Sequence, residues 1–220
     1  MTARLTGLYA ITPDLADAPA TDASVRTLSD RVAQAIAGGA RAVQYRDKTP
    51  DPGVRRQRAA ALAALCRAAE VPLIVNDDLE LALAVGADGV HLGRDDGDPA
   101  AARDRLGPAA IVGVSCYDRL DLALTAERAG ASYVAFGSFF PSAVKPGAVR
   151  PAPPLLTRAR ERLRIPLVAI GGITPQNAAS LIAAGADMLA VVTGLFSAPD
   201  IAAAARDYAQ RFAAGDRPTE

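Results

Sequence analysis

The chain has 220 residues, of which 50% are hydrophobic and 5% aromatic, and its formal net charge at neutral pH is zero. These values predict one globular domain with a substantial core, and they disfavour a general nucleic-acid binder, because such proteins carry positive charge that neutralises phosphates. No apolar run approaches the roughly 20 residues that span a bilayer, so we expect no membrane span, and we also expect no secretory signal.

Short apolar runs without charge alternate with helical segments along the whole chain. Strands are predicted, in chain order, at residues 8–11, 42–45, 73–76, 89–91, 111–115, 133–136, 167–170 and 188–192. Helices are expected at residues 24–38, 54–69, 79–85, 100–106, 120–129, 155–163, 175–184 and 200–212. Runs that are apolar on both faces are typical of a buried parallel sheet.

One sequence pattern, a helix that stops at glycine and is followed at once by a strand, recurs along the chain. It is clearest at residues 129–135 and 184–190, which share the start Ala-Gly-Ala. Eight such strand–helix units predict an α/β fold, a single (β/α)8 TIM barrel over residues 1–212, with a frayed tail over residues 213–220. An open doubly wound sheet is disfavoured, because no Gly-x-Gly follows the first strand.

The rarest polar residues all lie at or just beyond the ends of predicted strands. The chain has two lysines, Lys48 and Lys145, and one histidine, His91, and the carboxylates Asp77 and Asp96 lie in similar positions. Because the carboxyl ends of barrel strands meet at one face, these residues predict one site. We expect His91 near the pocket but not at the reacting atoms.

Two segments are typical of anion binding. Gln44, Arg46 and Lys48 have a spacing of two and share one side of an extended segment, which suits a diphosphate or triphosphate. In the second segment, Gly171 and Gly172 let backbone N–H groups approach a phosphate.

Two further features belong to the second segment. We expect Thr174 to cap the following helix and Pro175 to begin it. The loop after the eighth strand adds Val192 and Thr193 to the same phosphate site.

Acidic residues after the third and fourth strands predict a metal site. Asp77 and Asp96 supply oxygen ligands, which suit Mg²⁺ completed by phosphate oxygens and water, whereas zinc is disfavoured. Asp78 and Asp95 are lower-ranked alternatives, and Asp78 is expected to cap a helix.

The loop after the sixth strand carries a hydroxyl, Ser142, and the second lysine, Lys145. Lys145 can serve as a phosphate-binding charge or as a Schiff-base nucleophile, and its neighbours favour the charge. Ser115, at the end of the fifth strand, is expected to hydrogen-bond a polar ring. Cys66 is expected to be a plain core residue, and Cys116, which follows a strand end, is expected to be a small buried residue, with a place in the site lining as the alternative.

Taken in order, these residues resemble the thiamine phosphate synthase family. The resemblance is carried by residues 8–12, Gln44-x-Arg46-x-Lys48, Asn76-Asp77, residues 89–93, Asp96, Ser115, Pro141-Ser142-x-x-Lys145, residues 170–173 and Val192-Thr193. It implies a cytoplasmic alkyl/aryl transferase of thiamine biosynthesis. The implied reaction couples 4-amino-2-methyl-5-hydroxymethylpyrimidine diphosphate with a (carboxy)thiazole ethyl phosphate. The products are thiamine phosphate and pyrophosphate, and Mg²⁺ assists the departure of the diphosphate.

The resemblance also implies a role for each matching residue. The residues implied to bind the pyrimidine diphosphate are Gln44, Arg46, Lys48, Asn76, Ser115 and Lys145. Of these, the implied catalytic residues are Arg46, Lys48, Ser115 and Lys145. Asp77 and Asp96 are implied to hold Mg²⁺. The residues implied to bind the thiazole phosphate are Ser142, Ala143, Val144, Gly172, Val192 and Thr193. The implied partners are small molecules alone, with neither nucleic acid nor membrane, and we expect a monomer or a small homo-oligomer.

Two positions depart from the family pattern. The family's loop usually has Thr-x-Thr-Lys where this chain has Ser142-Ala143-Val144-Lys145, and Val144 can offer only its backbone. Thr193-Gly194 stands where the family often has serine before alanine. We therefore expect weaker or reshaped thiazole contacts with the reaction retained.

Three other functions compete with the synthase. A thiazole tautomerase shares the barrel and the phosphate loop but needs no magnesium–diphosphate site, so Arg46, Lys48, Asp77, Asp96 and Lys145 argue against it. A Schiff-base aldolase would use Lys145 as its nucleophile. A barrel that only binds a phosphorylated metabolite would show saturable binding without pyrophosphate release.

Overall fold

The computed structural model describes residues 5–15, 21–141 and 150–213. Its strands are β1 (Gly7–Ile11), β2 (Ala40–Tyr45), β3 (Leu73–Asn76), β4 (Gly89–Leu92), β5 (Ile111–Tyr117), β6 (Tyr133–Gly137), β7 (Leu167–Ile170) and β8 (Met188–Val191). Its helices are α1 (Asp22–Ala37), α2 (Pro52–Ala68), α3 (Leu79–Val85), α4 (Pro99–Leu106), α5 (Leu120–Arg128), α6 (Pro154–Arg162), α7 (Ala178–Ala183), α8 (Thr193–Phe196) and α9 (Ile201–Ala213).

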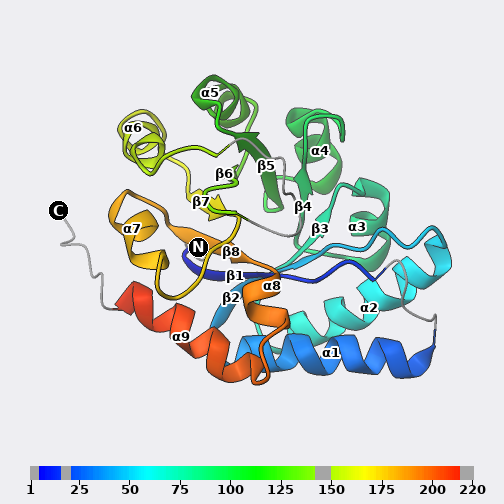
Figure 1. Ribbon diagram of the computed structural model, residues 1–220. Coiled ribbons are helices and arrows are strands. Elements are labelled where there is room, and N and C mark those ends of the chain that lie inside the picture. Colours follow the sequence, from blue (N-terminus) through cyan, green and yellow to red (C-terminus); the bar gives the residue numbers. More distant parts are fainter. Residues whose placement is uncertain (1–4, 16–20, 142–149, 214–220) are drawn as a thin grey trace.

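The eight strands form a closed parallel barrel in sequence order, and this confirms the predicted TIM barrel. The barrel closes where β1 pairs with β8, with Leu8 beside Leu189. The helices lie around the outside of the barrel, and the last of them, α9, packs beside α1 (Figure 1). Within the described ranges, no helix is both long enough and apolar enough to cross a membrane.

Alternation along each strand produces two separate cores. In β1, Leu8 and Ala10 belong to the outer core between sheet and helices, whereas Tyr9 and Ile11 belong to the core inside the barrel. The buried members of the inner core are Tyr9, Ile11, Ala42, Ile74, Tyr133, Ala135, Val168, Met188 and Ala190. Side chains therefore fill the barrel, and an open space can form only at its ends.

A buried ion pair fixes the chain just after β2. The guanidinium of Arg58, on α2, donates to the Asp47 carboxylate at 2.8 Å and to the Thr49 hydroxyl at 2.9 Å, and both charged side chains are fully buried. The Tyr45 hydroxyl donates to the same carboxylate at 2.7 Å. Burial alone would raise the pKa of Asp47, but the hydrogen bonds from Thr49, Arg58 and Tyr45 hold it below its usual value. The segment that carries two predicted site cations is thus held against α2.

The helix after β7 begins later than predicted. Thr174 and Pro175 were expected to cap and begin it, but residues 174–177 form a turn, and α7 starts at Ala178. The backbone N–H groups of Asn177 and Ala178 both donate to the Thr174 carbonyl. Thr174 caps this turn, because its hydroxyl accepts from the Asn177 N–H at 3.4 Å. The Asn177 side chain accepts from the Thr174 N–H and donates to the Gly172 carbonyl, so it also holds the preceding loop.

Three further differences concern the C-terminal part of the chain. Strand β8 ends at Val191, one residue earlier than predicted, and the unpredicted short helix α8 follows it. The expected tail lies outside the described residues, except that Ala213 is the last residue of α9.

Candidate active site

A cavity of about 1000 Å³ lies at the carboxyl ends of the strands. The predicted site residues that line it are Gln44, Arg46, Lys48, Asn76, Asp77, Asp96, Ser115, Gly172, Val192 and Thr193, and His91 lines it as well. The structure therefore gathers in one cavity every predicted site residue that it describes. The other predicted residues, Ser142, Ala143, Val144 and Lys145, lie outside the described residues.

The two cations after β2 face carboxylates. Arg46 pairs with Asp14 at 3.1 Å, and Lys48 pairs with Asp77 at 2.5 Å. Asp14 also accepts from the backbone N–H of Lys48 at 3.0 Å, so it orders both cations, a role that the sequence did not suggest. Half of the Lys48 side chain is exposed, and exposed ion pairs are weak. An incoming phosphate can therefore replace these carboxylates as the partner of Lys48 and Arg46.

The carboxyl groups of Asp77 and Asp96 lie against each other. Asp77 has a φ of 65°, and its backbone N–H donates to the His91 carbonyl at 2.8 Å, which fixes the turn after β3. Asp96 accepts from the Gly93 N–H at 2.8 Å. Burial and the neighbouring Asp77 carboxylate raise the pKa of Asp96 above its usual value. Burial would also raise the pKa of Asp77, but contacts with Lys48 and Asp96 hold it below its usual value.

This acidic pair fits the predicted Mg²⁺. Two adjacent carboxyl groups repel each other when both are ionised, and a divalent cation removes that repulsion. Within the described part of the chain, no group of three or more His, Cys, Asp or Glu side chains is placed to hold a metal. Two carboxylates completed by phosphate oxygens and water are the usual arrangement for Mg²⁺.

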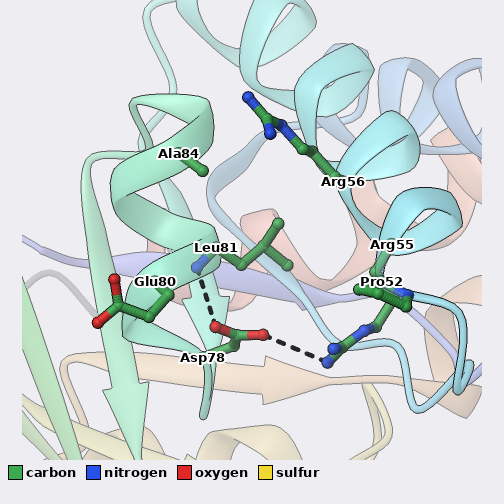
Figure 2. Close-up of a pocket in the computed structure, with 7 residues that line it drawn as sticks. All are labelled: Pro52, Arg55, Arg56, Asp78, Glu80, Leu81 and Ala84. Carbon is green, nitrogen blue, oxygen red and sulfur yellow. Dashed lines mark hydrogen bonds and ion pairs between the residues drawn. The ribbon is translucent and has the colours of Figure 1, made fainter.

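Asp78 points away from this cavity. Its carboxylate accepts from the Leu81 N–H at 2.9 Å and pairs with the Arg55 guanidinium at 3.3 Å, as Figure 2 shows. These residues line a separate pocket of about 210 Å³ on the outer side, between α2 and α3. The prediction that Asp78 caps a helix is confirmed, and this explains why two adjacent aspartates face different surroundings.

The backbone of the loops after β7 and β8 lines the cavity. A Cβ atom on Gly172, whose φ is 59°, would lie 2.3 Å from the Pro141 carbonyl oxygen, so only glycine fits there. The Tyr208 hydroxyl on α9 donates to the Ile173 carbonyl at 2.8 Å, and a Cβ on Gly194 would lie 2.5 Å from that hydroxyl. Tyr208 therefore bonds to the β7 loop and packs closely against Gly194, a role that sequence reasoning missed. Bare backbone from these two loops is what a barrel phosphate site needs.

Polar side chains bond to one another between the acidic pair and the glycine loops. The Tyr9 and Tyr133 hydroxyls lie 2.8 Å apart, the Gln44 amide contacts Tyr9, and His91 contacts Tyr133 and Ser115. Nothing in the local sequence singles out Tyr9 or Tyr133, although each lies on a strand at an inward position. Burial raises the pKa of both phenols, so both keep their protons at neutral pH.

The two cysteines are core residues, as predicted. Cys66 and Cys116 are free thiols, fully buried in the outer core. Burial raises the pKa of each thiol to about 12, so neither forms a reactive thiolate at neutral pH.

Comparison with known proteins gives one consistent result. The family described as thiamine monophosphate synthase matches residues 8–195. The thiamine-phosphate synthase of Thioalkalivibrio sulfidiphilus is 56% identical over 209 residues, which cover 95% of this chain and 96% of that protein. The enzyme of the same name from Thiobacillus denitrificans is 56% identical over 208 residues, covering 94% and 95%. Among solved structures, thiamine phosphate pyrophosphorylase from Pyrococcus furiosus matches with a TM-score of 0.82 and 32% identity, covering 96% of this chain and 98% of that one.

Proposed function

This chain belongs to the thiamine monophosphate synthase family, and we propose that it joins a hydroxymethylpyrimidine diphosphate to a thiazole ethyl phosphate. The products would be thiamine phosphate and pyrophosphate. Membership of the family makes the chain a transferase of thiamine biosynthesis, whereas the two substrates and the role of Mg²⁺ are part of the proposal.

The observation that carries the proposal is that one cavity is lined by two separate groups of residues suited to binding anions. Arg46, Lys48 and the acidic pair follow β2, β3 and β4, whereas the glycine loops follow β7 and β8. In a closed barrel of eight strands in sequence order, β3 and β7 lie on opposite sides. A diphosphate at one side and a monophosphate at the other would therefore face each other across the cavity.

The proposed reaction exchanges one bond at the pyrimidine methylene carbon for another. The bond between the pyrimidine methylene carbon and the diphosphate oxygen breaks, and the electron pair leaves with pyrophosphate. The thiazole nitrogen then supplies an electron pair to the same carbon, and a carboxylated thiazole would also lose CO₂. An aminopyrimidine can stabilise the positive charge on its methylene carbon, so the step needs no covalent bond to the protein.

The chain's own residues contribute position and charge. Arg46 and Lys48 would bind the diphosphate and stabilise the negative charge that grows on it as it leaves. Asp77 and Asp96 would hold Mg²⁺, which when bound supplies further positive charge to the leaving group. Gly172 and Thr193 would fix the thiazole phosphate, so that the two reacting atoms are held close together.

The test is an assay of pyrophosphate release by the purified protein. Supplied together, the pyrimidine diphosphate, the thiazole phosphate and Mg²⁺ should give pyrophosphate and a product with the mass of thiamine phosphate. Each of the three should be required. A thiazole isomer without pyrophosphate would instead assign the chain to a tautomerase, and saturable binding without any product would assign it to a binding protein.

Cellular location, oligomeric state and the role of Lys145 stay predictions from the sequence. We expect a cytoplasmic monomer or small homo-oligomer that acts on small molecules alone. Lys145 is expected to add a compact positive charge at the diphosphate, so Lys145→Arg should lower turnover although the charge is kept.

A further inference from the structure

Four hydrogen bonds join five side chains inside the barrel, four of which line the cavity while Tyr133 is buried in the inner core. The Gln44 amide nitrogen lies 2.9 Å from the Tyr9 hydroxyl, which lies 2.8 Å from the Tyr133 hydroxyl. The Tyr133 hydroxyl lies 2.9 Å from His91 Nδ1, and His91 Nε2 lies 2.9 Å from the Ser115 hydroxyl. The Tyr133 and His91 rings are also stacked, with centroids 5.6 Å apart, which holds the imidazole in its plane.

The Gln44 amide sets the direction in which hydrogens are donated along these four bonds. An amide nitrogen can only donate, so Tyr9 accepts from Gln44 and its own hydroxyl hydrogen is available for Tyr133. Tyr133 then donates to His91 Nδ1. An imidazole that accepts at Nδ1 carries its proton at Nε2, so His91 donates to Ser115.

The opposite direction leaves a donor unsatisfied. If His91 carried its proton at Nδ1, Tyr133 would accept from His91 and donate to Tyr9. Tyr9 would then accept from both Gln44 and Tyr133, and its own hydroxyl hydrogen would be buried beside two donors. Tyr9 is 1% exposed, and a buried donor without a partner is costly, so the first direction is favoured.

We propose that Tyr133 holds His91 in the tautomer protonated at Nε2, and that this makes Ser115 a hydrogen-bond donor toward the bound substrate. Tyr133 and His91 are thus positioning residues, because they act on the substrate through the Ser115 hydroxyl. The His91 N–H occupies one lone pair of the Ser115 oxygen. The hydrogen of the Ser115 hydroxyl is then directed to an acceptor atom of the ligand.

This inference rests on the proposed function only for the identity of that ligand. An aminopyrimidine offers ring nitrogens as acceptors and an amino group as a donor. In the direction inferred here, Ser115 selects a ring nitrogen. In the opposite direction, Ser115 would donate to His91 and could only accept, so it would select the amino group. The state of His91 therefore decides which edge of the ring faces Ser115.

The first test measures the tautomer directly in the ligand-free protein. His91 is the single histidine of the chain, so nitrogen NMR of histidine-labelled protein reports on this ring alone. We expect the proton on Nε2 in the unaltered protein. A proton on Nδ1, or a doubly protonated ring, would overturn the proposal whatever the enzyme's activity.

Two matched variants test the assignment to Tyr133. Tyr133→Phe removes the donor to His91 Nδ1, and we expect a mixture of tautomers. Tyr9→Phe removes a hydroxyl from the same cluster, and with it the acceptor to which Tyr133 would donate in the opposite direction, so Tyr133 should still donate to His91 and the Nε2 tautomer should persist. Thermal unfolding verifies that each variant is folded. A tautomer unchanged in Tyr133→Phe, or lost equally in both variants, would contradict the role of Tyr133.

A double-mutant cycle tests the link from Tyr133 to Ser115. Ser115→Ala alone should lower kcat/KM for the pyrimidine substrate about tenfold, the usual effect of one lost hydrogen bond. In the Tyr133→Phe background the same change should cost clearly less, whereas additive effects would contradict the coupling. The Nε2 tautomer without synthase activity would refute the proposed function alone, because the tautomer is measured without substrate.

Discussion

Two adjacent aspartates have different tasks because one residue has an unusual backbone conformation. Asp77 has a positive φ and faces the cavity, whereas Asp78 caps α3 and pairs with Arg55. Aspartate and asparagine tolerate this left-handed conformation better than most residues, so the side chain at position 77 serves both the turn and the site.

Replacing the cavity carboxylates with amides should remove Mg²⁺-dependent turnover. Asp77→Asn and Asp96→Asn keep the shape of the side chain, and asparagine accepts the positive φ at residue 77. Because each removes a negative charge from the metal site, we expect kcat/KM to fall at least about a hundredfold. Steady-state kinetics over a range of Mg²⁺ concentrations measures this.

Asp78→Asn is the matched control for these variants. Asparagine caps helices as well as aspartate does, and position 78 lies outside the cavity. Turnover should therefore stay within about threefold of the unaltered protein. A comparable loss in all three variants would show that the site carboxylates were assigned wrongly.

At the scale of elements, the buried pair Asp47–Arg58 joins the end of β2 to α2. Asp47→Asn removes the carboxylate charge that pairs with the fully buried Arg58 guanidinium. We therefore expect the free energy of unfolding at neutral pH to fall by about 3 kcal/mol, measured by urea denaturation. Asp14→Asn, in a partly exposed pair with Arg46, should cost at most about 1 kcal/mol.

The Asp47–Arg58 pair also predicts how the free energy of unfolding depends on pH. The folded protein holds the pKa of Asp47 below its usual value, so ionised Asp47 stabilises the fold above the unfolded pKa of about 3.9. That contribution is lost as the pH falls through the lower, folded pKa. The Asn variant should lose less stability than the unaltered protein over this acid range. Parallel acid curves would indicate that Asp47 keeps an ordinary pKa.

The loop after β7 is an element whose shape depends on glycine. Gly172→Ala places a methyl group against the Pro141 carbonyl at a positive φ. We expect the KM for the thiazole phosphate to rise at least about tenfold, because the loop backbone must move away from the phosphate. Kinetics with the pyrimidine substrate held in excess measures this KM.

Gly130→Ala is the control for Gly172→Ala, because it introduces backbone strain without displacing the loop after β7. Gly130 also has a positive φ, 84°, but no described atom lies within 4 Å of the added methyl group, and the residue is outside the cavity. We expect a loss of about 1 kcal/mol of stability with an unchanged KM. An equal rise in KM in both variants would argue against a phosphate at the β7 loop.

At the scale of the whole molecule, barrel closure brings distant parts of the chain to one ligand site. The acidic pair should bind Mg²⁺ weakly alone, since two carboxylates complete few of its ligand positions. Pyrophosphate with Mg²⁺, at about a hundred times the dissociation constant, should raise Tm by about 5–10 °C. Pyrophosphate alone should raise it far less.

The same thermal measurement on Asp96→Asn provides the control. This variant keeps Arg46 and Lys48, so it should retain the small effect of pyrophosphate and lose the additional effect of Mg²⁺. If pyrophosphate alone stabilises the unaltered protein as much as the mixture does, the acidic pair is not a metal site.

Much of the molecule could be predicted from local sequence alone. Strand and helix order follows from short apolar runs and stop signals, and their order fixes the barrel because parallel strands with helical crossovers close in few ways. Lys48, Asp77 and Asp96 could be chosen because they are chemically distinctive and lie just after strands. The carboxyl ends of all strands lie at one face of a parallel barrel, so these residues had to meet.

What the tertiary structure alone decided are the pairings between distant residues. Tyr9 and Tyr133 are 124 residues apart, and Asp14 and Arg46 are 32 apart, so nothing in their own neighbourhoods indicates a partner. Tyr208 contacts the β7 loop because α9 packs beside α7 and α8 on the outside of the barrel, and the Asn177 side chain holds that loop through the Gly172 carbonyl. Local sequence determines which face of a strand or helix a side chain occupies, but hydrogen-bond direction and charge pairing depend on atoms that only the closed barrel brings within 3 Å or so of each other.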